Sequence, residues 1–422
     1  MKFTFIVLIN DKIWQRYTRR PHYSALAELG DLIVIEYPLT ILSKKFLKRP
    51  LREIKYYLKY SWSKRIDTLS GAKIIRPIIL FPSILENPFC EFINRKLVAL
   101  FLFSIKAKNS KEIYFLTYYN QAWLIAKKNY KRFILDMNDE WSMIEYDDLV
   151  KEKIKKLTFD IIAKVDLVLT VTKRLRNKYN CNAKIFYLPN AVDINHYVPS
   201  FDTKTKKTKE PSLIYDKEFL SLITNDPRKY IKSIDLIKEI KNPAVGSISG
   251  LAGNWSDFDF MAKVEELLPP EFNLLSTGNI GLPTKQDFLP GYFKYISKNR
   301  MRFLGHLDYS ILPDFLGKIN VGIVMHRMDE FNTHSAPNKI WAYLAMGLPV
   351  VSTNFLTEPD KEIFEGMVSF ANTPEEYVEY IVYAYENDSQ ELKIKRRRLA
   401  VKNSTFNRAK KIVNIFKEKL NL

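Results

Sequence analysis

The chain has few of the residues that build disulfide-stapled, zinc-binding or membrane-spanning proteins. Its 422 residues include only 2 cysteines, Cys90 and Cys181, and these form no CxxC pair. This excludes a disulfide framework and a cysteine zinc site, and it is typical of a reducing compartment. The longest apolar run, residues 97–105, is far shorter than the ~20 residues that span a bilayer. The opening stretch, residues 3–9, predicts a first buried strand rather than a signal peptide.

Acidic residues are also in short supply. The chain has 47 acidic against 66 basic residues, which gives a formal net charge of +19. Such a balance favours nucleic acid, an anionic membrane surface or anionic substrates as partners. Nucleic acid is not expected, because no recognised nucleic-acid-binding module is present. The sequence therefore points to an anionic ligand, an anionic membrane or both.

The basic excess is densest between Leu39 and Arg65, where Glu53 is the one acid and five aromatic residues are interleaved. Two interpretations stay open: a basic amphipathic segment that lies on an anionic membrane, or a solvated helix and loop face. The first predicts a cytoplasmic protein that is peripheral on the inner membrane face. The basic residues are Lys44, Lys45, Lys48, Arg49, Arg52, Lys55, Lys59, Lys64 and Arg65.

Strands and helices are predicted to alternate on both sides of a polar segment. Hydrophobic residues make up 46% of the chain, and its length suggests two or three domains with sizeable cores. Residues 200–243 begin with a charged, proline-bounded stretch that is typical of a linker. Short buried strands that alternate with helices, before and after it, predict two α/β domains with parallel sheets.

The most informative stretch, residues 334–353, reads HSAPNKIWAYLAMGLPVVST. It predicts a loop, a helix capped by Ser335 with Pro337 in its first turn, a stop at Gly347 and a buried strand. The N–H groups at the start of such a helix form an anion site, to which Lys339 could add a positive charge. The same pattern is also that of an ordinary helix and strand in any α/β protein.

This stretch resembles the nucleotide-sugar motif of group 1 (family 4-like) GT-B glycosyltransferases, which is close to P-x-K-x-x-E-Y-L-A-x-G-x-P-V-V-S. The family places at one position a Glu that grips the ribose, and this chain has Ala342 there. His334 stands where related members often carry an acid. Either another residue holds the ribose, or the nucleotide binds differently, or the chain has lost activity.

Further motifs resemble a bacterial polysaccharide, teichuronic-acid-type subgroup of that family. The string IWQR…RPHYSALAEL follows the first strand, and a D-x-x-D-x-W string falls at Asp136, Asp139 and Trp141. Carboxylates at the end of a strand face a ligand cleft, so Asp139 and Glu140 could handle an acceptor hydroxyl; the alternative is that one of them caps the next helix. Gly246, Gly250, Trp255 and Asp257 also match the subgroup, and residues that match the wider family are Asn190, Val192, Asp193, Gly305, Leu312, Pro313 and Val321.

The resemblance implies a GT-B fold, in which two Rossmann-like α/β domains face each other across a cleft and a C-terminal helix crosses back. We expect an acceptor-side domain over 1–195, a linker with short helices over 196–242 and a nucleotide-sugar domain over 243–388. A C-terminal basic helix over 389–422 is expected to pack toward the first domain.

The implied activity is that of a hexosyltransferase. It moves a sugar from a nucleotide-diphosphate sugar to a glycan or polyprenyl-linked acceptor in cell-surface polysaccharide synthesis, with retention and without a metal or other cofactor. The alternative is a catalytically impaired GT-B scaffold that binds glycan. Asp139 is the candidate catalytic residue. Arg16, Arg19, Arg20 and Glu140 are assigned to the acceptor or phosphate side, or are charges in water. The expected donor-binding residues are Ser249, Gly250, Asn332, Thr333, Ser335, Ala336, Pro337, Asn338 and Lys339.

Overall fold

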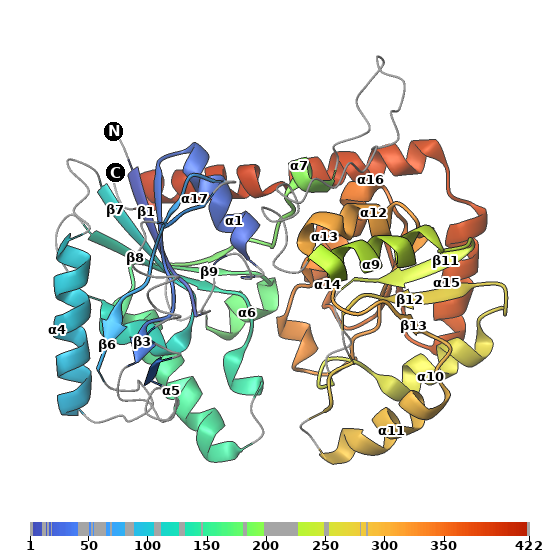
Figure 1. Cartoon of the computed structure of the whole chain (residues 1–422), viewed down its shortest axis with the longest axis horizontal. Coiled ribbons are helices and arrows are strands. Elements are labelled where there is room, and N and C mark those ends of the chain that lie inside the picture. The colour runs from blue at the N-terminus through green and yellow to red at the C-terminus, as the bar shows by residue number, and fades with distance from the viewer. Residues whose placement is uncertain are drawn as a thin grey trace. The chain divides into compact units, whose positions relative to one another are not determined.

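The computed structural model divides the chain into two compact units (Figure 1). The first unit comprises Met1–Asn190 and Thr405–Leu422, and the second comprises Ala191–Ser404. The structure describes residues 3–10, 14, 17, 19–40, 50–51, 54, 65–67, 70–80, 88–104, 111–125, 131–144, 147–179, 184–197, 227–248, 253–278, 280–283 and 286–419.

The first unit is built on an eight-stranded sheet, of order β10-β9-β8-β7-β1-β2-β5-β4. Its strands are parallel except for β4, which pairs antiparallel with β5. The bounds are β1 Phe3–Leu8, β2 Asp31–Ile35, β4 Arg65–Ile66, β5 Lys73–Ile75, β7 Lys111–Leu116, β8 Lys131–Met137, β9 Leu167–Thr170 and β10 Ile185–Tyr187. The strands β3 (Leu39–Thr40) and β6 (Ile78–Ile79) form a separate two-stranded parallel sheet in the same unit.

Both faces of this sheet are covered. In β1, Phe5 and Val7 belong to one hydrophobic core and Ile6 and Leu8 to another, since successive side chains point to opposite faces. This explains why residues 5–8 form a continuous apolar run. The helices and 3-10 helices of the unit are α1 Arg20–Ser24, η2 Ala25–Glu28, α4 Pro88–Ser104, η5 Tyr119–Leu124, η6 Trp141–Met143, α5 Asp148–Lys164, α6 Lys173–Lys178 and α17 Thr405–Lys419.

The end of the chain forms two helices rather than the single helix predicted over 389–422. Helix α16 (Gln390–Lys402) belongs to the second unit, whereas α17 packs into the core of the first through Ala409, Ile412 and Phe416. The return of the last helix to the first unit is thus confirmed. The helix breaks at Asn403 and Ser404 because their backbone pairs with Val192, which donates its N–H to the Asn403 carbonyl (3.2 Å). Asn and Ser are also weaker helix formers than the residues before them.

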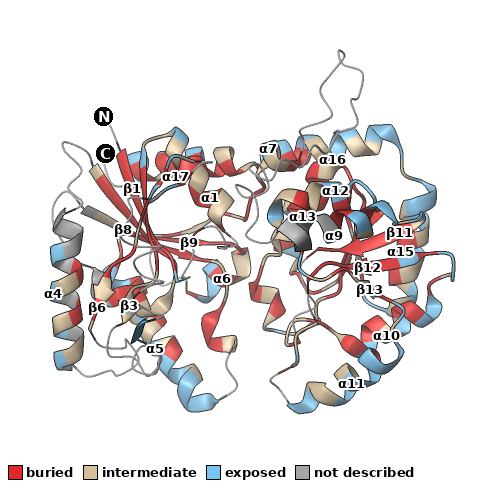
Figure 2. Ribbon diagram, viewed as in Figure 1, coloured by how far each residue is buried: buried red, intermediate tan, exposed pale blue. Residues whose placement is uncertain are grey.

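The second unit has a six-stranded sheet of order β13-β12-β11-β14-β15-β16, and every pair is parallel. The strands are buried and exposed helix faces lie outside them (Figure 2). Strand bounds are β11 Ala244–Ser247, β12 Asn273–Ser276, β13 Arg302–Phe303, β14 Val321–Val324, β15 Val350–Thr353 and β16 Val368–Ala371. The helices are α7 Ile194–Tyr197, α9 Pro227–Lys238, α10 Phe258–Leu267, α11 Leu289–Lys298, α12 Leu312–Leu316, α13 Asn338–Met346, α14 Glu358–Lys361, α15 Pro374–Glu386 and α16. The described part of this unit also has four 3-10 helices: η7 Gln286–Phe288, η8 Tyr309–Ile311, η9 Asn332–His334 and η10 Glu362–Phe364.

The strand order of the second unit determines where a ligand is expected. From β11 the chain moves outward through β12 and β13, and it then returns to the other side of β11 with β14. Ligands of open α/β sheets bind at such a switch point, outside the carboxyl ends of the strands. A ligand site is therefore expected at the loops after β11 and β14. Among the described residues, none of the helices is long and apolar enough to cross a membrane.

Candidate functional site

The loops after β11 and β14 are tied together by backbone and amide hydrogen bonds. The Trp255 carbonyl accepts the N–H of Arg327 (2.8 Å) and the Nδ2 of Asn332 (3.4 Å). Asp329 Oδ1 accepts both the N–H and the Nδ2 of Asn332, at 3.0 and 3.1 Å. The Phe331 ring packs edge-on against Trp255, 4.5 Å between centroids. The predicted loop before α13 is therefore an ordered part of the second unit.

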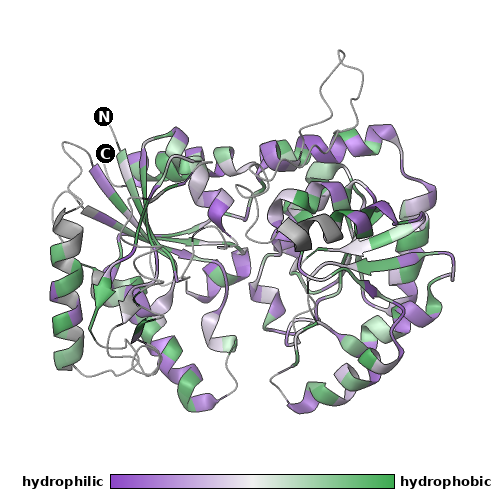
Figure 3. Ribbon diagram, in the orientation of Figure 1, coloured by the Kyte–Doolittle hydropathy of each residue, from purple (hydrophilic) through white to green (hydrophobic). Residues whose placement is uncertain are grey.

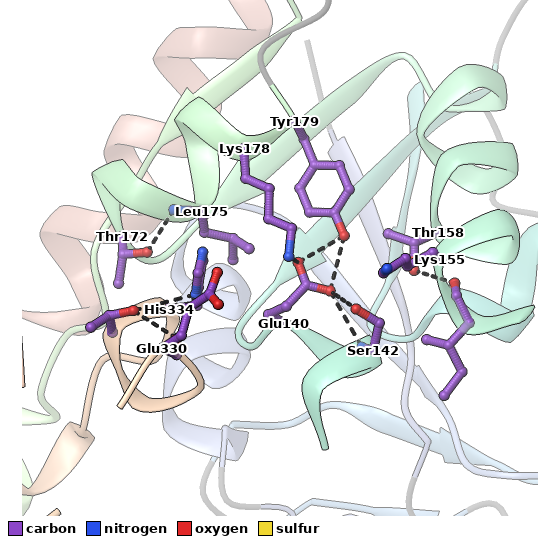
Figure 4. A network of polar contacts seen from close by, with 12 residues as sticks. Glu140, Ser142, Lys155, Thr158, Thr172, Leu175, Lys178, Tyr179, Glu330 and His334 are labelled. Atoms are coloured by element: carbon purple, nitrogen blue, oxygen red, sulfur yellow. Dashed lines mark hydrogen bonds and ion pairs between the residues drawn. The ribbon is translucent and has the colours of Figure 1, made fainter. Parts of the chain in front are cut away.

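The polar groups of this loop mostly serve the loop itself. Asn332 is fully buried, and the Thr333 hydroxyl donates to the Glu330 carbonyl at 2.7 Å. His334 Nδ1 lies 2.8 Å from the same carbonyl (Figure 4). Asn332 and Thr333, predicted to touch a donor sugar, thus lie directly before the helix with their nitrogen and hydroxyl protons used in the turn.

Helix α13 begins without a side-chain cap, and the prediction that Ser335 caps it is wrong. Pro337 is the residue before the helix, and within the described residues no side-chain cap hydrogen bond is made at this end. Ser335 Oγ instead donates to the Asn332 carbonyl (3.0 Å) and closes the preceding 3-10 turn. The prediction that Gly347 ends the helix is confirmed, with φ at +80°. An uncapped nine-residue helix directs its amide protons and its positive dipole end at a ligand.

Lys339, in the first turn of α13, brings a desolvated positive charge to the same place. Burial lowers the pKa of its ammonium to about 8. No ion pair to Lys339 is found among the residues that the structure describes. His326 follows β14, and burial together with Lys339 lowers its pKa well below the usual value, so that its imidazole is neutral at pH 7. A desolvated ammonium at an uncapped helix start favours binding of an anion.

Tyr343 fixes the loop after β11 beside α13. Its hydroxyl donates to the Ile323 carbonyl (3.2 Å) and accepts the N–H of Ile248 (2.9 Å). Its ring lies over Gly322, where a methyl group would come within 2.5–2.8 Å of the ring atoms. The chain therefore enters residues 249–252 next to the helix; Ser249 and Gly250, two predicted donor-binding residues, lie outside the described residues.

Ala342, which replaces the family's ribose-gripping Glu, is a core residue. It is 3% exposed and belongs to the cluster that includes Trp341 and Tyr343. Its methyl group is therefore packed within the core of the second unit. The prediction that Pro337 lies in the first turn of the helix is wrong, because Ala336 and Pro337 precede α13 and Asn338 is its first residue.

In the first unit, Asp136 at the end of β8 is the centre of a buried ion network. It is paired with Arg19 Nη2 (3.0 Å) and Arg408 Nη2 (3.0 Å), and it accepts the Tyr23 hydroxyl at 2.7 Å. Burial alone would raise the pKa of Asp136, but the two guanidinium groups and Tyr23 outweigh it and lower that pKa. Arg408 also donates through Nε to the Pro189 carbonyl (3.2 Å).

The arginines predicted for the acceptor or phosphate side are thus used within the unit. Arg19 is buried in the ion pair with Asp136. Arg20 pairs with Asp67 at 2.7 Å. Arg16 lies outside the described residues. These contacts give Arg19 and Arg20 structural roles.

Glu140 and Asp139 are adjacent in the chain, but their surroundings shift the pKa values of the two carboxyl groups in opposite directions. Glu140 is buried, and it accepts from Ser142 Oγ (2.6 Å) and the Tyr179 hydroxyl (2.8 Å), with Lys178 Nζ at 3.1 Å (Figure 4). Burial would raise the pKa of Glu140, but these donors lower it. It also accepts the N–H of Ser142 and caps η6, which is the capping alternative of the sequence interpretation. Glu140 therefore holds the loop in place.

Asp139 is half-buried and accepts Asn138 Nδ2 at 2.7 Å. Burial raises the pKa of its carboxyl group to about 7, although Arg19 and Asn138 oppose the shift. A carboxyl group that titrates near neutral pH can both take and give a proton, which is what general acid–base chemistry requires.

No candidate metal cluster accompanies these groups. Within the described residues, no three or more His, Cys, Asp and Glu side chains are grouped as metal ligands. Asp257, part of the D-x-D string in the sequence, instead caps α10 through the N–H of Phe260 (3.0 Å).

No family model matches the chain, and no curated protein matches it. Solved structures do match over the whole length. A sucrose-phosphate synthase from Thermosynechococcus elongatus matches with a TM-score of 0.66 and 10% identity, over 99% of each chain. The trehalose-6-phosphate synthase OtsA matches with a TM-score of 0.63 and 9% identity, over 98% of each chain.

The fold is that of GT-B glycosyltransferases. A third match to this GT-B fold is HepE from Anabaena in complex with UDP-glucose, with a TM-score of 0.59 and 12% identity, over 98% of this chain and 99% of that one. The likeness extends through both units, so the GT-B fold assignment rests on the complete chain.

Proposed function

We propose that this protein is a glycosyltransferase that moves a sugar from a nucleotide-diphosphate sugar to a glycan or lipid-linked glycan acceptor in cell-surface polysaccharide synthesis. The observation that carries the proposal is Lys339, a desolvated ammonium beside an uncapped helix start at the switch point of the second sheet. HepE, which shares the fold, has been solved with UDP-glucose.

In the proposed donor site, the first turn of α13 and Lys339 hold the diphosphate. Ser249 and Gly250 approach it from the loop after β11, and the sugar lies toward Asn332 and Thr333. When the bond between the sugar and the diphosphate breaks, negative charge grows on the leaving phosphate. Amide dipoles and an ammonium that are already in place stabilise this charge without reorganising. No metal is needed for that step.

In the proposed acceptor site, Asp139 orients the attacking hydroxyl and receives its proton. We also propose retention of the anomeric configuration, because the resembled family retains it.

Nucleotide binding and release test the proposal. A panel of UDP-, GDP-, ADP- and dTDP-sugars is titrated by calorimetry, and release of the nucleoside diphosphate is then followed with and without EDTA. We expect one base to bind with a Kd between about 1 μM and 1 mM. Its sugar nucleotide should be hydrolysed or transferred slowly, with the same rate in EDTA. Absence of binding by every nucleotide at millimolar concentration would contradict the proposal.

The role of Asp139 is tested separately. Asp139→Asn is expected to lower the rate of nucleotide release about 100-fold while the Kd for the donor is unchanged, because the lost group moves a proton and does not hold the diphosphate. In the unaltered protein the rate should rise with pH through about 7, as the carboxyl group deprotonates. Asp160→Asn, on the exposed face of α5, is the control and should change neither quantity. A weaker donor Kd in Asp139→Asn would contradict the assigned role.

The buried Ala342 favours one alternative, a catalytically impaired GT-B scaffold that binds glycan. A scaffold that still binds nucleotide would show a calorimetric Kd with no release in the presence of any acceptor fraction. The two measurements above therefore separate the enzyme from the scaffold.

A further inference from the structure

Helix α4 of the first unit exposes three large apolar side chains on one face. Phe89, Phe92 and Leu100 are 67%, 57% and 69% exposed. At 100° per residue they fall within an arc of about 80°. Asn94 and Val98, on the opposite side, are buried, and Asn94 Oδ1 accepts the N–H of Leu80 at 3.1 Å. The helix is thus anchored by one face and presents an apolar stripe on the other.

A single basic residue lies within the stripe. Lys96 is exposed, and its ammonium is 5.4 Å from the centroid of the Phe92 ring. Helix α4 is coloured mostly hydrophobic in Figure 3, and its only acid is Glu91. A helix that combines exposed phenyl rings with a long basic side chain is suited to a water–lipid boundary, where the rings enter the apolar region and the ammonium stays with the headgroups.

A strongly basic segment of the sequence follows β3, which pairs with a strand that packs against α4. Helix α4 packs on β6, and Thr40 of β3 pairs with Ile79 of β6. Directly after β3, residues 41–64 carry eight basic residues and one acid. The first of these residues therefore follows a strand that lies beside the helix. The basic segment of the sequence thus begins directly after a strand whose partner, β6, packs against α4.

We propose that the exposed stripe of α4 docks the first unit on an anionic lipid bilayer. A second copy of the chain is the less suitable occupant, because two copies that each carry a formal net charge of +19 repel one another. Three side chains also fall short of the ~800 Å² that each partner buries in a standard protein interface. The proposal does not depend on the transferase activity, since a scaffold with the same stripe would dock equally well.

Sedimentation of the full chain with vesicles tests the docking. Vesicles of phosphatidylcholine alone are compared with vesicles that also contain about 30% phosphatidylglycerol, which gives them an anionic surface. We expect binding to the anionic vesicles that weakens with salt. The triple variant Phe89→Ser, Phe92→Ser and Leu100→Ser should lose at least about tenfold in vesicle affinity, and Lys96→Glu about fivefold or more.

The matched control replaces three exposed apolar residues on other helices: Leu149→Ser, Phe293→Ser and Tyr383→Ser. It should bind vesicles as the unaltered chain does. Circular dichroism and the unfolding midpoint show whether each variant is folded, and Lys96→Glu gives a test with little risk to folding. The proposal is overturned if the unaltered chain binds no anionic vesicle, or if the folded stripe variants bind as well as the control. It is also overturned if the stripe variants only convert a dimer to a monomer in light scattering.

Discussion

Replacing Asp136 by asparagine is expected to destabilise the first unit by about 3–5 kcal/mol. Asn keeps the shape and an acceptor oxygen, but it leaves the buried guanidinium groups of Arg19 and Arg408 without a counter-charge. The loss should appear as an earlier unfolding transition in urea. Hydrogen exchange of α17 should rise with it, because Arg408 attaches that helix to β8 and to the Pro189 carbonyl.

The pH dependence of this network follows from the lowered pKa of Asp136. A carboxyl group with a depressed folded pKa stabilises the fold above its unfolded pKa, near 3.9, and that contribution is lost as the pH falls through the folded pKa. Asp136→Asn should therefore remove part of the acid sensitivity of the first unit.

Two variants check the cause. Asp136→Asn combined with Arg408→Met removes one of the uncompensated charges, so it should be less unstable than the sum of the single variants. Asp148→Asn, in an exposed pair with Lys151, should leave the unfolding midpoint unchanged. An additive double variant, or a stable Asp136→Asn protein, would show that the network is not the anchor of α17.

Replacing Lys339 by methionine is expected to weaken binding of the nucleoside diphosphate at least about thirtyfold. The same change should raise the thermal midpoint of the ligand-free protein, because it removes a partly buried charge that is paired with no carboxylate of the described residues. A lysine with a merely structural role would not produce these opposite effects. Calorimetry and a thermal melt on the same sample measure both.

The affinity should also depend on pH in one direction. The ammonium of the free protein deprotonates as the pH rises through about 8, whereas a bound diphosphate stabilises the charged form. Affinity should therefore fall above pH 8, and binding near that pH should take up a proton. Titrations in buffers of different ionisation enthalpy detect this uptake. The guanidinium of the Lys339→Arg variant stays protonated, so its affinity should not fall between about pH 7.5 and about pH 9.5. Equal pH dependence in both proteins would place the titrating group elsewhere.

Local signals in the sequence were sufficient to predict much of the second unit. The apolar pattern from Ile340 to Ala345, the glycine at 347 and the valines of β15 predicted the helix, its stop and the strand that follow one another in the structure. These features depend on neighbouring residues only. The role of Ser335 was predicted wrongly because its hydroxyl is used in the 3-10 turn before it, which the helix signal alone does not reveal.

Long-range contacts were beyond sequence reasoning. Asp136 matched a family string, but Arg408 lies 272 positions further along the chain, and no spacing rule connects them. Arg19 was predicted to face a ligand because its partner, Asp136, lies 117 positions further along the chain. The role of Tyr343 in holding Ile248 likewise became visible only when β14 and α13 were in place.

The backbone pairing of Val192 with Asn403 and Ser404 has a consequence for how the chain is assembled. The second unit runs without interruption from Ala191 to Ser404, and its first and last residues are neighbours. In topological terms it is an insertion into the loop that would otherwise join β10 to α17. A short peptide between Asn190 and Thr405 would close the first unit. Each unit could then be produced as one continuous chain.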